Sequence, residues 1–229
     1  MSSGNMQSAI AAYQKENDPL KRAAMFAALL EKLTPENAKA AFLALRENGG
    51  RGGRRGGFGR GGDETRLMLN AWGRIDGATA IQELQAMAAA EGEEREGRGR
   101  RGGRDEGRSA FDMYSVLSGW ATEDASRAKE FVSGVEDERQ KSMLTSGIVR
   151  GLMVNGVGEA VNFVASLSPD DRGRDRYMST IANEVLEDGA VAGAAWIDTL
   201  SDDLREGAME QVAERYVRED LEAAKAWVT

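Results

Sequence analysis

Apolar residues return along this chain at spacings of three and four, which is the period of an α-helix with one buried face. The pattern recurs six times around one polar or glycine position, which we call the anchor of each repeat: Thr34, Asp76, Asp124, Gly156, Gly189 and Asp220. Apolar or aromatic residues stand eight and four positions before every anchor. The pattern therefore predicts six helices that each end near an anchor.

A second pattern follows each anchor. An alanine or glycine stands four positions after it, and a large apolar residue stands eight positions after it: Phe42, Leu84, Val132, Val164, Ile197 and Val228. Both offsets fall on one face of a helix. We therefore expect a hairpin in each repeat, in which Asp and Thr anchors cap the start of the second helix and Gly156 and Gly189 close the first.

Hairpins of this kind cannot bury their apolar faces alone, and they stabilise one another by stacking. The predicted fold is all-α, a right-handed solenoid of about six helical hairpins with a period of 31–33 residues. It forms one domain over residues 1–229, with a lone leading helix at 5–16. A side chain no larger than a methyl group after each anchor is expected to let neighbouring helices approach closely.

The first two repeats are longer than the others. Successive anchors lie 42, 48, 32, 33 and 31 residues apart, and the excess falls in two glycine-rich segments, 49–62 and 91–108. Segments of this composition cannot bury enough apolar surface to fold. They are predicted to be flexible insertions on the same edge of the solenoid, because both lie between a second helix and the next first helix.

The insertions supply the candidate polyanion-binding residues. Residues 49–62 carry four arginines and no acid, in Arg-Gly-Gly triplets that resemble the RGG boxes of RNA-binding proteins, whereas 91–108 balances its arginines with acids. Guanidinium groups bridge phosphates and an aromatic ring stacks on bases. The candidates are Arg51, Arg54, Arg55, Phe58, Arg60, Arg98, Arg100, Arg101 and Arg104. Contact of these basic segments with protein, including the acidic remainder of the chain, is the competing hypothesis.

Four tryptophans divide into two classes. Trp72 and Trp120 occupy the apolar position four residues before the anchor, which predicts that they are buried. Trp196 and Trp227 share a position that is occupied by Glu83 in another repeat, so they are predicted to be more exposed. Trp196 and Trp227 are therefore the candidates for binding a peptide.

Composition excludes most catalytic chemistry. The chain has no cysteine and no histidine, which removes disulfides, thiolate nucleophiles, the usual zinc sites and every mechanism that needs an imidazole base. The acid pairs Asp170/Asp171 and Asp202/Asp203 stand where helices are expected to start, and a structural role accounts for them. We predict no catalytic residue, no metal site, no cofactor and no small-molecule substrate.

The repeats resemble a known family. Trp120, Asp124, Ala128 and Phe131, and again Asp220, Ala224 and Trp227, follow a bacterial repeat of the form W-x-x-x-D-P-x-A-A-x-x-W, and more loosely the tetratricopeptide hairpin. The proline of that motif is missing after each of the aspartate anchors. The resemblance implies a scaffold for peptide binding or assembly, without catalytic residues.

The sequence thus predicts a non-enzymatic helical-repeat scaffold that mediates protein–protein interaction or self-association, with RNA or single-stranded nucleic-acid binding as the alternative. No apolar run is long enough to cross a membrane. If Met1 is the natural start, we expect a soluble cytoplasmic protein, and if a leader has been removed, a secreted or periplasmic one.

Overall fold

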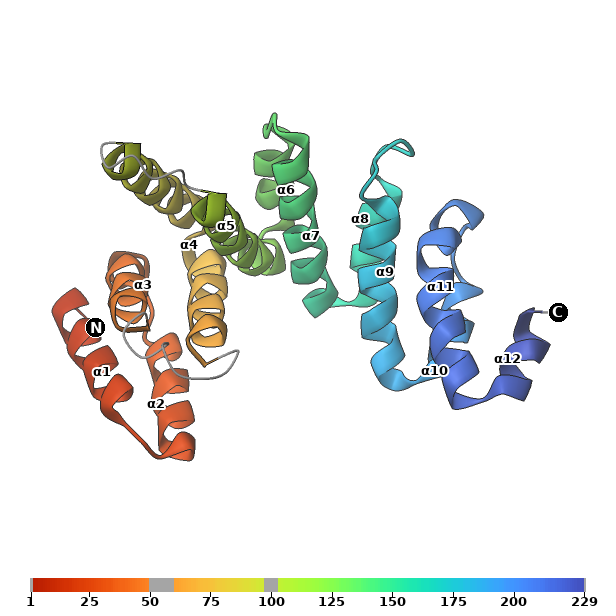
Figure 1. The fold of residues 1–229 in the computed structure, drawn as a ribbon, viewed down its shortest axis with the longest axis horizontal. Helices are drawn as coiled ribbons and strands as arrows, with labels where there is room; N and C mark the ends of the chain where they lie inside the picture. The colour runs from red at the N-terminus through yellow and green to blue at the C-terminus, as the bar shows by residue number, and fades with distance from the viewer. Residues whose placement is uncertain (1, 50–59, 97–102, 229) are drawn as a thin grey trace. The chain divides into compact units, whose positions relative to one another are not determined.

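The computed structural model describes the backbone of residues 2–49, 60–96 and 103–228, and the side chains of 2–47, 63–91 and 109–227. In these residues the chain forms α-helices, one short 3₁₀ helix and no β-strand (Figure 1). The all-α fold class is confirmed. The chain divides into two compact units, Met1–Ile148 and Val149–Thr229, which we call unit 1 and unit 2. The prediction of a single domain over 1–229 stays a prediction.

Unit 1 begins with a helix at the place of the predicted lone leading helix. Its helices are α1 (Ser3–Lys15), α2 (Pro19–Glu31), α3 (Pro35–Gly49), α4 (Arg60–Glu96), α5 (Gly103–Glu123) and α6 (Ala125–Ser133), followed by most of α7 (Glu138–Asn155). Unit 2 holds the end of α7, then α8 (Val157–Ala165), α9 (Arg174–Val185), the 3₁₀ helix η1 (Leu186–Asp188), α10 (Ala190–Ile197), α11 (Asp202–Glu219) and α12 (Leu221–Val228).

Every anchor lies where one helix gives way to the next. The three aspartate anchors accept a hydrogen bond on Oδ1 from the backbone N–H three residues later, at 3.2 Å for Asp76, 3.1 Å for Asp124 and 3.0 Å for Asp220. At Asp76 this break lies inside α4, where the backbone turns out of helical geometry (φ −156°, ψ 76°). The predicted aspartate caps are confirmed.

The two glycine anchors work differently. Gly156 and Gly189 have φ angles of 137° and 99°, a region in which a Cβ atom is strained. The Gly156 N–H also bonds to the carbonyls of Leu152 and Met153 at the end of α7. Their predicted role of closing the preceding helix is therefore confirmed.

The predicted core positions are buried. All six small residues four positions after the anchors are buried: Ala38, Ala80, Ala128, Ala160, Gly193 and Ala224. The six residues eight positions before the anchors are also buried: Phe26, Met68, Val116, Ile148, Ile181 and Val212. The position four before is less uniform, since Leu30, Val185 and Tyr216 are only half-buried.

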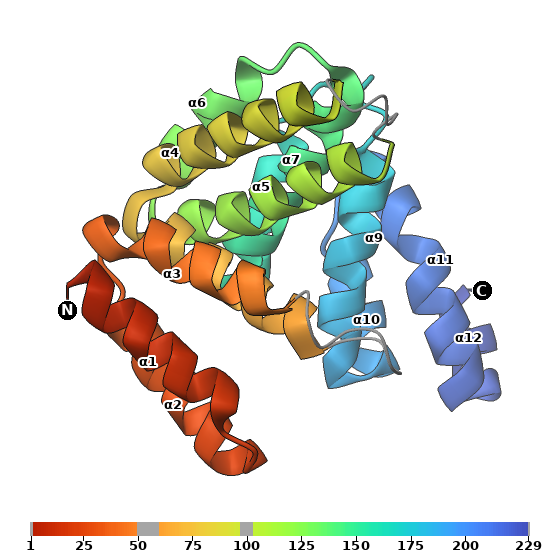
Figure 2. The same cartoon turned by 60° about the vertical axis from the view of Figure 1, so that its left-hand side comes forward.

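Glycines bring α4 and α5 into close contact. The two helices run side by side in unit 1 (Figure 2). A Cβ atom added at Gly73 would lie 2.1 Å from the Val116 carbonyl oxygen, and one added at Gly119 would lie 1.9 Å from the Asn70 carbonyl oxygen. The contact is therefore made by backbone on both sides and excludes any side chain at these two positions.

The predicted insertions are too long at their ends. Helix α4 already begins at Arg60 and continues to Glu96, and α5 begins at Gly103, so the backbone at 60–62, 91–96 and 103–108 is helical. Residues 91–96 are mostly glutamate, a good helix former, which accounts for the helical backbone there. The centres of both predicted insertions, 50–59 and 97–102, lie outside the described residues.

Candidate functional site

Helices α9 and α11 pack side by side in unit 2. Near their N-terminal ends the contact is tight, because a Cβ atom added at Gly207 would lie 2.5 Å from the Cα atom of Asp175. Arg174, only 7% exposed, donates from Nη2 to Asp203 Oδ2 at 2.8 Å across the same junction. That guanidinium and the Ser201 side chain lower the pKa of Asp203, with the Ser201 hydrogen bond the larger cause.

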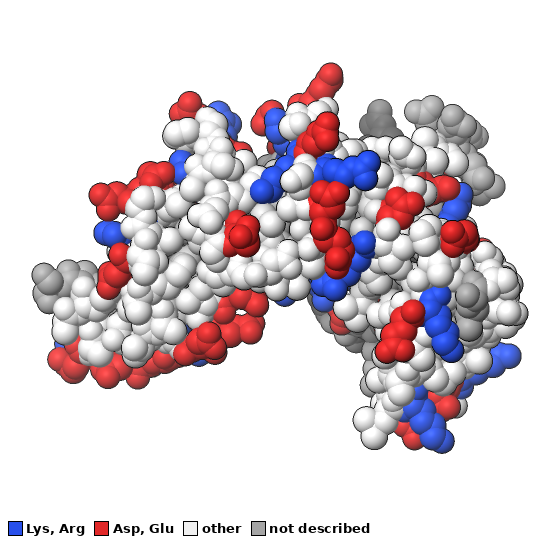
Figure 3. Space-filling model, turned by 180° about the vertical axis from the view of Figure 1, so that it is seen from behind, with Lys and Arg blue, Asp and Glu red and all other residues white. Residues whose placement is uncertain are grey.

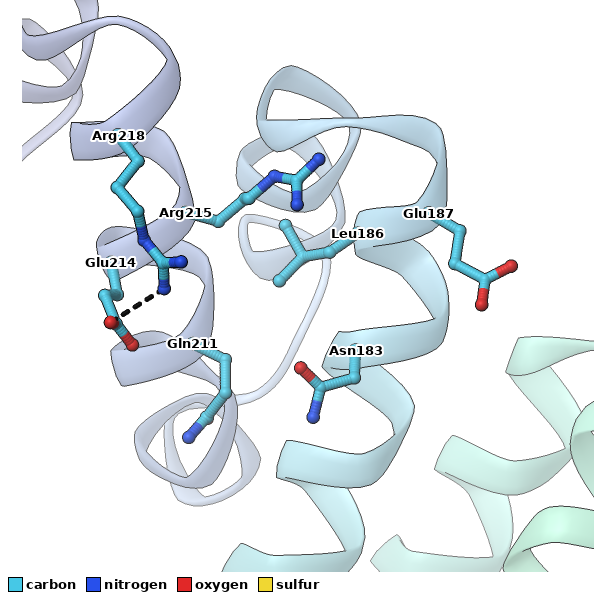
Figure 4. A pocket seen from close by; sticks show the side chains of 7 residues that line it. All are labelled: Asn183, Leu186, Glu187, Gln211, Glu214, Arg215 and Arg218. Atoms are coloured by element: carbon cyan, nitrogen blue, oxygen red, sulfur yellow. Dashed lines mark ion pairs between the residues drawn. The ribbon is translucent and has the colours of Figure 1, made fainter. Parts of the chain in front are cut away.

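Toward their C-terminal ends the two helices leave a hollow between them, which we call the α9–α11 groove. It is open to solvent and has a volume of about 330 Å³, at the lower end of the size range of ligand pockets. Figure 4 shows the lining residues, which are Asn183, Leu186 and Glu187 from the α9 side and Gln211, Glu214, Arg215 and Arg218 from α11.

The charges of α11 in the groove are paired within that helix. Arg218 Nη2 lies 2.7 Å from Glu214 Oε1, and the Arg215 guanidinium donates to Glu219. Glu219 also accepts the Ala190 backbone N–H on Oε2 at 2.9 Å. Its pKa is lowered, first by that backbone hydrogen bond and then by the Arg215 side chain.

Glu219 thereby caps α10 from another helix. Gly189 precedes α10 and has no side chain to accept a first-turn N–H, so the carboxylate of α11 takes that role. The same carboxylate holds Arg215 at the groove. The end of the groove is therefore fixed by a contact that joins α10 to α11.

Two amide side chains in the groove are not used by the fold. In Figure 4, Asn183 points from α9 toward α11, and the Gln211 side chain lies along α11. The Gln211 Oε1 atom is inaccessible to solvent and accepts no hydrogen bond. An unsatisfied buried acceptor costs about 1–3 kcal/mol, so rotation of the Gln211 side chain to bring this oxygen to a ligand donor would recover that free energy.

The shifted pKa values elsewhere have structural causes. The pKa of Tyr13 is raised to about 12, mainly by burial and then by a hydrogen bond with Glu64. Arg22 donates to the Tyr13 hydroxyl at 3.2 Å and to both Glu64 oxygens at 3.0 and 3.1 Å, which ties α2 to α1 and α4. Among the residues with described side chains, no group of three acidic or other ligating side chains is placed to hold a metal ion.

The sequence-predicted site residues are not brought together in the described part of the chain. The side chains of Arg51, Arg54, Arg55, Phe58, Arg60, Arg98, Arg100, Arg101 and Arg104 all lie outside the described residues. Trp196 lies in α10 and Trp227 in α12, both half-buried, and the Trp227 ring packs on Tyr216 with centroids 5.8 Å apart. Trp72 and Trp120 are 1% and 8% exposed, as predicted.

Neither Trp196 nor Trp227 lines the α9–α11 groove, and the residues that do were missed. The repeat register contained a signal for them. Gln211, Glu214, Arg215 and Arg218 follow the spacing 0, 3, 4, 7, which forms one polar stripe along a helix. Asn183 and Glu214 also share the position six before the anchor.

In the part of the chain that the structure describes, no helix combines the length and the apolar character that a membrane crossing requires. Comparison of the chain with protein-family models, with curated proteins and with solved structures finds no match.

Proposed function

We propose that this protein is a non-enzymatic helical-repeat scaffold that binds an extended protein segment in the α9–α11 groove. The scaffold is a right-handed solenoid of about six stacked hairpins of the degenerate bacterial repeat, with a period of 31–33 residues. The observation that carries the proposal is the pair of amides that line the groove, Asn183 and Gln211, together with the unsatisfied oxygen of Gln211, which rotation of that side chain would bring to a ligand.

An amide side chain suits a peptide ligand. Its carbonyl oxygen can accept a hydrogen bond from a peptide N–H, and its NH₂ group can donate one to a peptide carbonyl. Amides projecting from two neighbouring helices can therefore hold an extended main chain without reading its sequence, while charged side chains such as Glu187 select the ligand's side chains.

The repeat pattern supports a scaffold of stacked hairpins. The anchors lie at helix breaks and the small positions after them are buried. In such a stack the first helices of successive hairpins line one surface, on which an extended ligand can contact several repeats. The first helices α9 and α11 fit this arrangement, because the groove lies directly between them.

The groove favours a peptide over a nucleic acid. A phosphate backbone offers acceptors, whereas the unsatisfied Gln211 Oε1 needs a donor. The groove also contains two carboxylates against two guanidinium groups, and both guanidinium groups already have carboxylate partners. Binding of RNA through the arginine-glycine segments remains the alternative outcome of the test.

The test begins with the selection of peptides from a phage-displayed random library on the full chain. Selected peptides are then measured by fluorescence polarisation against the wild type and the double variant Asn183→Ala/Gln211→Ala. Two neutral hydrogen bonds of about 0.5–1.5 kcal/mol each predict that the double variant binds about 5- to 150-fold more weakly. The control Asn162→Ala removes an exposed amide from α8, outside the groove, and should bind as the wild type does.

Failure to enrich any peptide, or equal binding by the double variant, contradicts the proposal. A single-stranded RNA measured across a salt series provides the other arm. Four phosphate contacts predict a slope of about −3 for the logarithm of the binding constant against the logarithm of salt concentration. RNA binding with this slope that is lost on deletion of residues 49–62 would favour the RNA alternative instead.

A further inference from the structure

The two units differ sharply in charge. Residues 149–229 contain 16 acidic and 8 basic side chains, so unit 2 carries the whole net charge of −8 and residues 1–148 sum to zero. In Figure 3, acidic side chains crowd the lower left of the view, over the α10–α12 end of the chain, with few basic ones among them. A cationic ligand is therefore attracted to unit 2 before it makes any specific contact.

The groove contains unused acceptors beside the NH₂ groups of its two amides. Gln211 Oε1 is buried without a donor, and Glu187 forms no ion pair with the described residues. Arginine is the side chain that matches this need, because a guanidinium has five N–H donors and no acceptor. Glycine suits the main chain of the same ligand, since without a Cβ atom its peptide groups can approach the amides of Asn183 and Gln211 closely.

One segment of this chain has that chemistry. Residues 49–62 contain nine glycines, four arginines and no acid, a net charge of +4. We infer that the α9–α11 groove binds the arginine-glycine segment 49–62 of a second copy of this chain, so that the protein assembles with itself. This inference rests on the proposed function, and it names the ligand of the same groove.

The receptor for the test is the full chain with residues 49–62 replaced by a glycine-serine linker of equal length, which removes the internal competitor. The probe is a fluorescein-labelled peptide of residues 49–62, and its control is the same peptide with each arginine replaced by glutamine. We expect binding of the arginine peptide and at least about tenfold weaker binding of the glutamine peptide, because each exposed ion pair contributes about two- to fivefold.

Two variants with equal charge changes separate the groove from diffuse attraction. Glu187→Gln removes the unpaired groove carboxylate and should weaken the arginine peptide about two- to fivefold. Glu206→Gln removes an exposed carboxylate of α11 that does not line the groove and should leave the affinity within experimental error. Gln211→Ala should weaken the same peptide about fivefold or more. Equal affinities for all of these variants would overturn the inference.

Light scattering tests whether two copies of the chain associate. The average mass of the wild type should rise above 24.7 kDa with concentration, while the linker-replaced chain stays a monomer. A wild type that is monomeric throughout overturns assembly between copies. If library-selected peptides bind the groove but the 49–62 peptide neither binds nor competes with them, this inference fails and the proposed function stands. If the selected peptides also fail, the proposed function fails with it.

Discussion

The contact between α4 and α5 makes a quantitative prediction about Gly119. An alanine there would place its Cβ atom 1.9 Å from the Asn70 carbonyl oxygen, against 3.4 Å or more in ordinary contact, so the helices must separate by about 1.5 Å. Such overpacking costs about 1–3 kcal/mol, and overlap with backbone, which cannot rotate away, belongs at the upper end. The better helix propensity of alanine returns about 0.5–1 kcal/mol. We therefore expect Gly119→Ala to destabilise unit 1 by about 2 kcal/mol.

Urea unfolding followed by tryptophan fluorescence measures this change. A Trp196→Phe/Trp227→Phe background leaves Trp72 and Trp120, both buried in unit 1, as reporters. With a slope of about 2 kcal/mol per molar urea, the midpoint should fall by roughly 1 M. The matched control is Gly4→Ala in α1, which has nothing within 4 Å of the new methyl group and should not lose stability. Equal midpoints for the two variants would refute the backbone contact between α4 and α5.

Two further predictions concern unit 2. Gly189→Ala should destabilise it by about 1–3 kcal/mol, because φ is 99° there, whereas Gly134→Ala, at φ −82°, should have little effect in thermal melts. Glu219→Gln should lower the melting temperature at neutral pH. The folded pKa of this carboxyl lies below 4.5, held down first by the Ala190 N–H and then by Arg215, so the charged form stabilises the fold above that pH. The difference from the wild type should shrink as the pH falls below 4.5, and a difference that is constant with pH would contradict this origin.

The repeat could be predicted because its signals are local. An aspartate that caps a helix acts on an N–H three residues away, so Asp76 marks a break even inside the long helix α4. The burial of every small residue after the anchors follows from the same register. The signals that set the ends of the glycine-rich segments were weaker, because glutamate-rich residues 91–96 favour a helix while the glycines around them oppose it.

The polar stripe of α11 can be read from the sequence, but the groove cannot, because it depends on how α9 and α11 pack against each other. Asn183 and Gln211 lie 28 positions apart in a chain whose repeat places equivalent residues 31 apart, so register alone does not bring them together. Their meeting depends on the junction of Gly207 with Asp175 at the other end of the helices. Gly207 permits this close approach because it has no side chain, and hydrophobic periodicity does not show which glycines have that role.

Both units contain glycines that lie against the backbone of a neighbouring helix, but these glycines are arranged differently in the two units. Between α4 and α5 it is reciprocal, since Gly73 and Gly119 each meet the partner helix, and the two contacts fix the crossing from both sides. Between α9 and α11 the contact of Gly207 and the Arg174–Asp203 ion pair both lie toward the N-terminal ends, while Asn183 and Arg218 lie toward the C-terminal ends. The close contact lies at one end of the two helices, the Glu219 hydrogen bond to α10 lies at the other, and the groove is lined by the residues between them. The position of glycines along these helices therefore sets where neighbouring helices pack backbone against backbone, and under the proposed function it also sets where a ligand can bind.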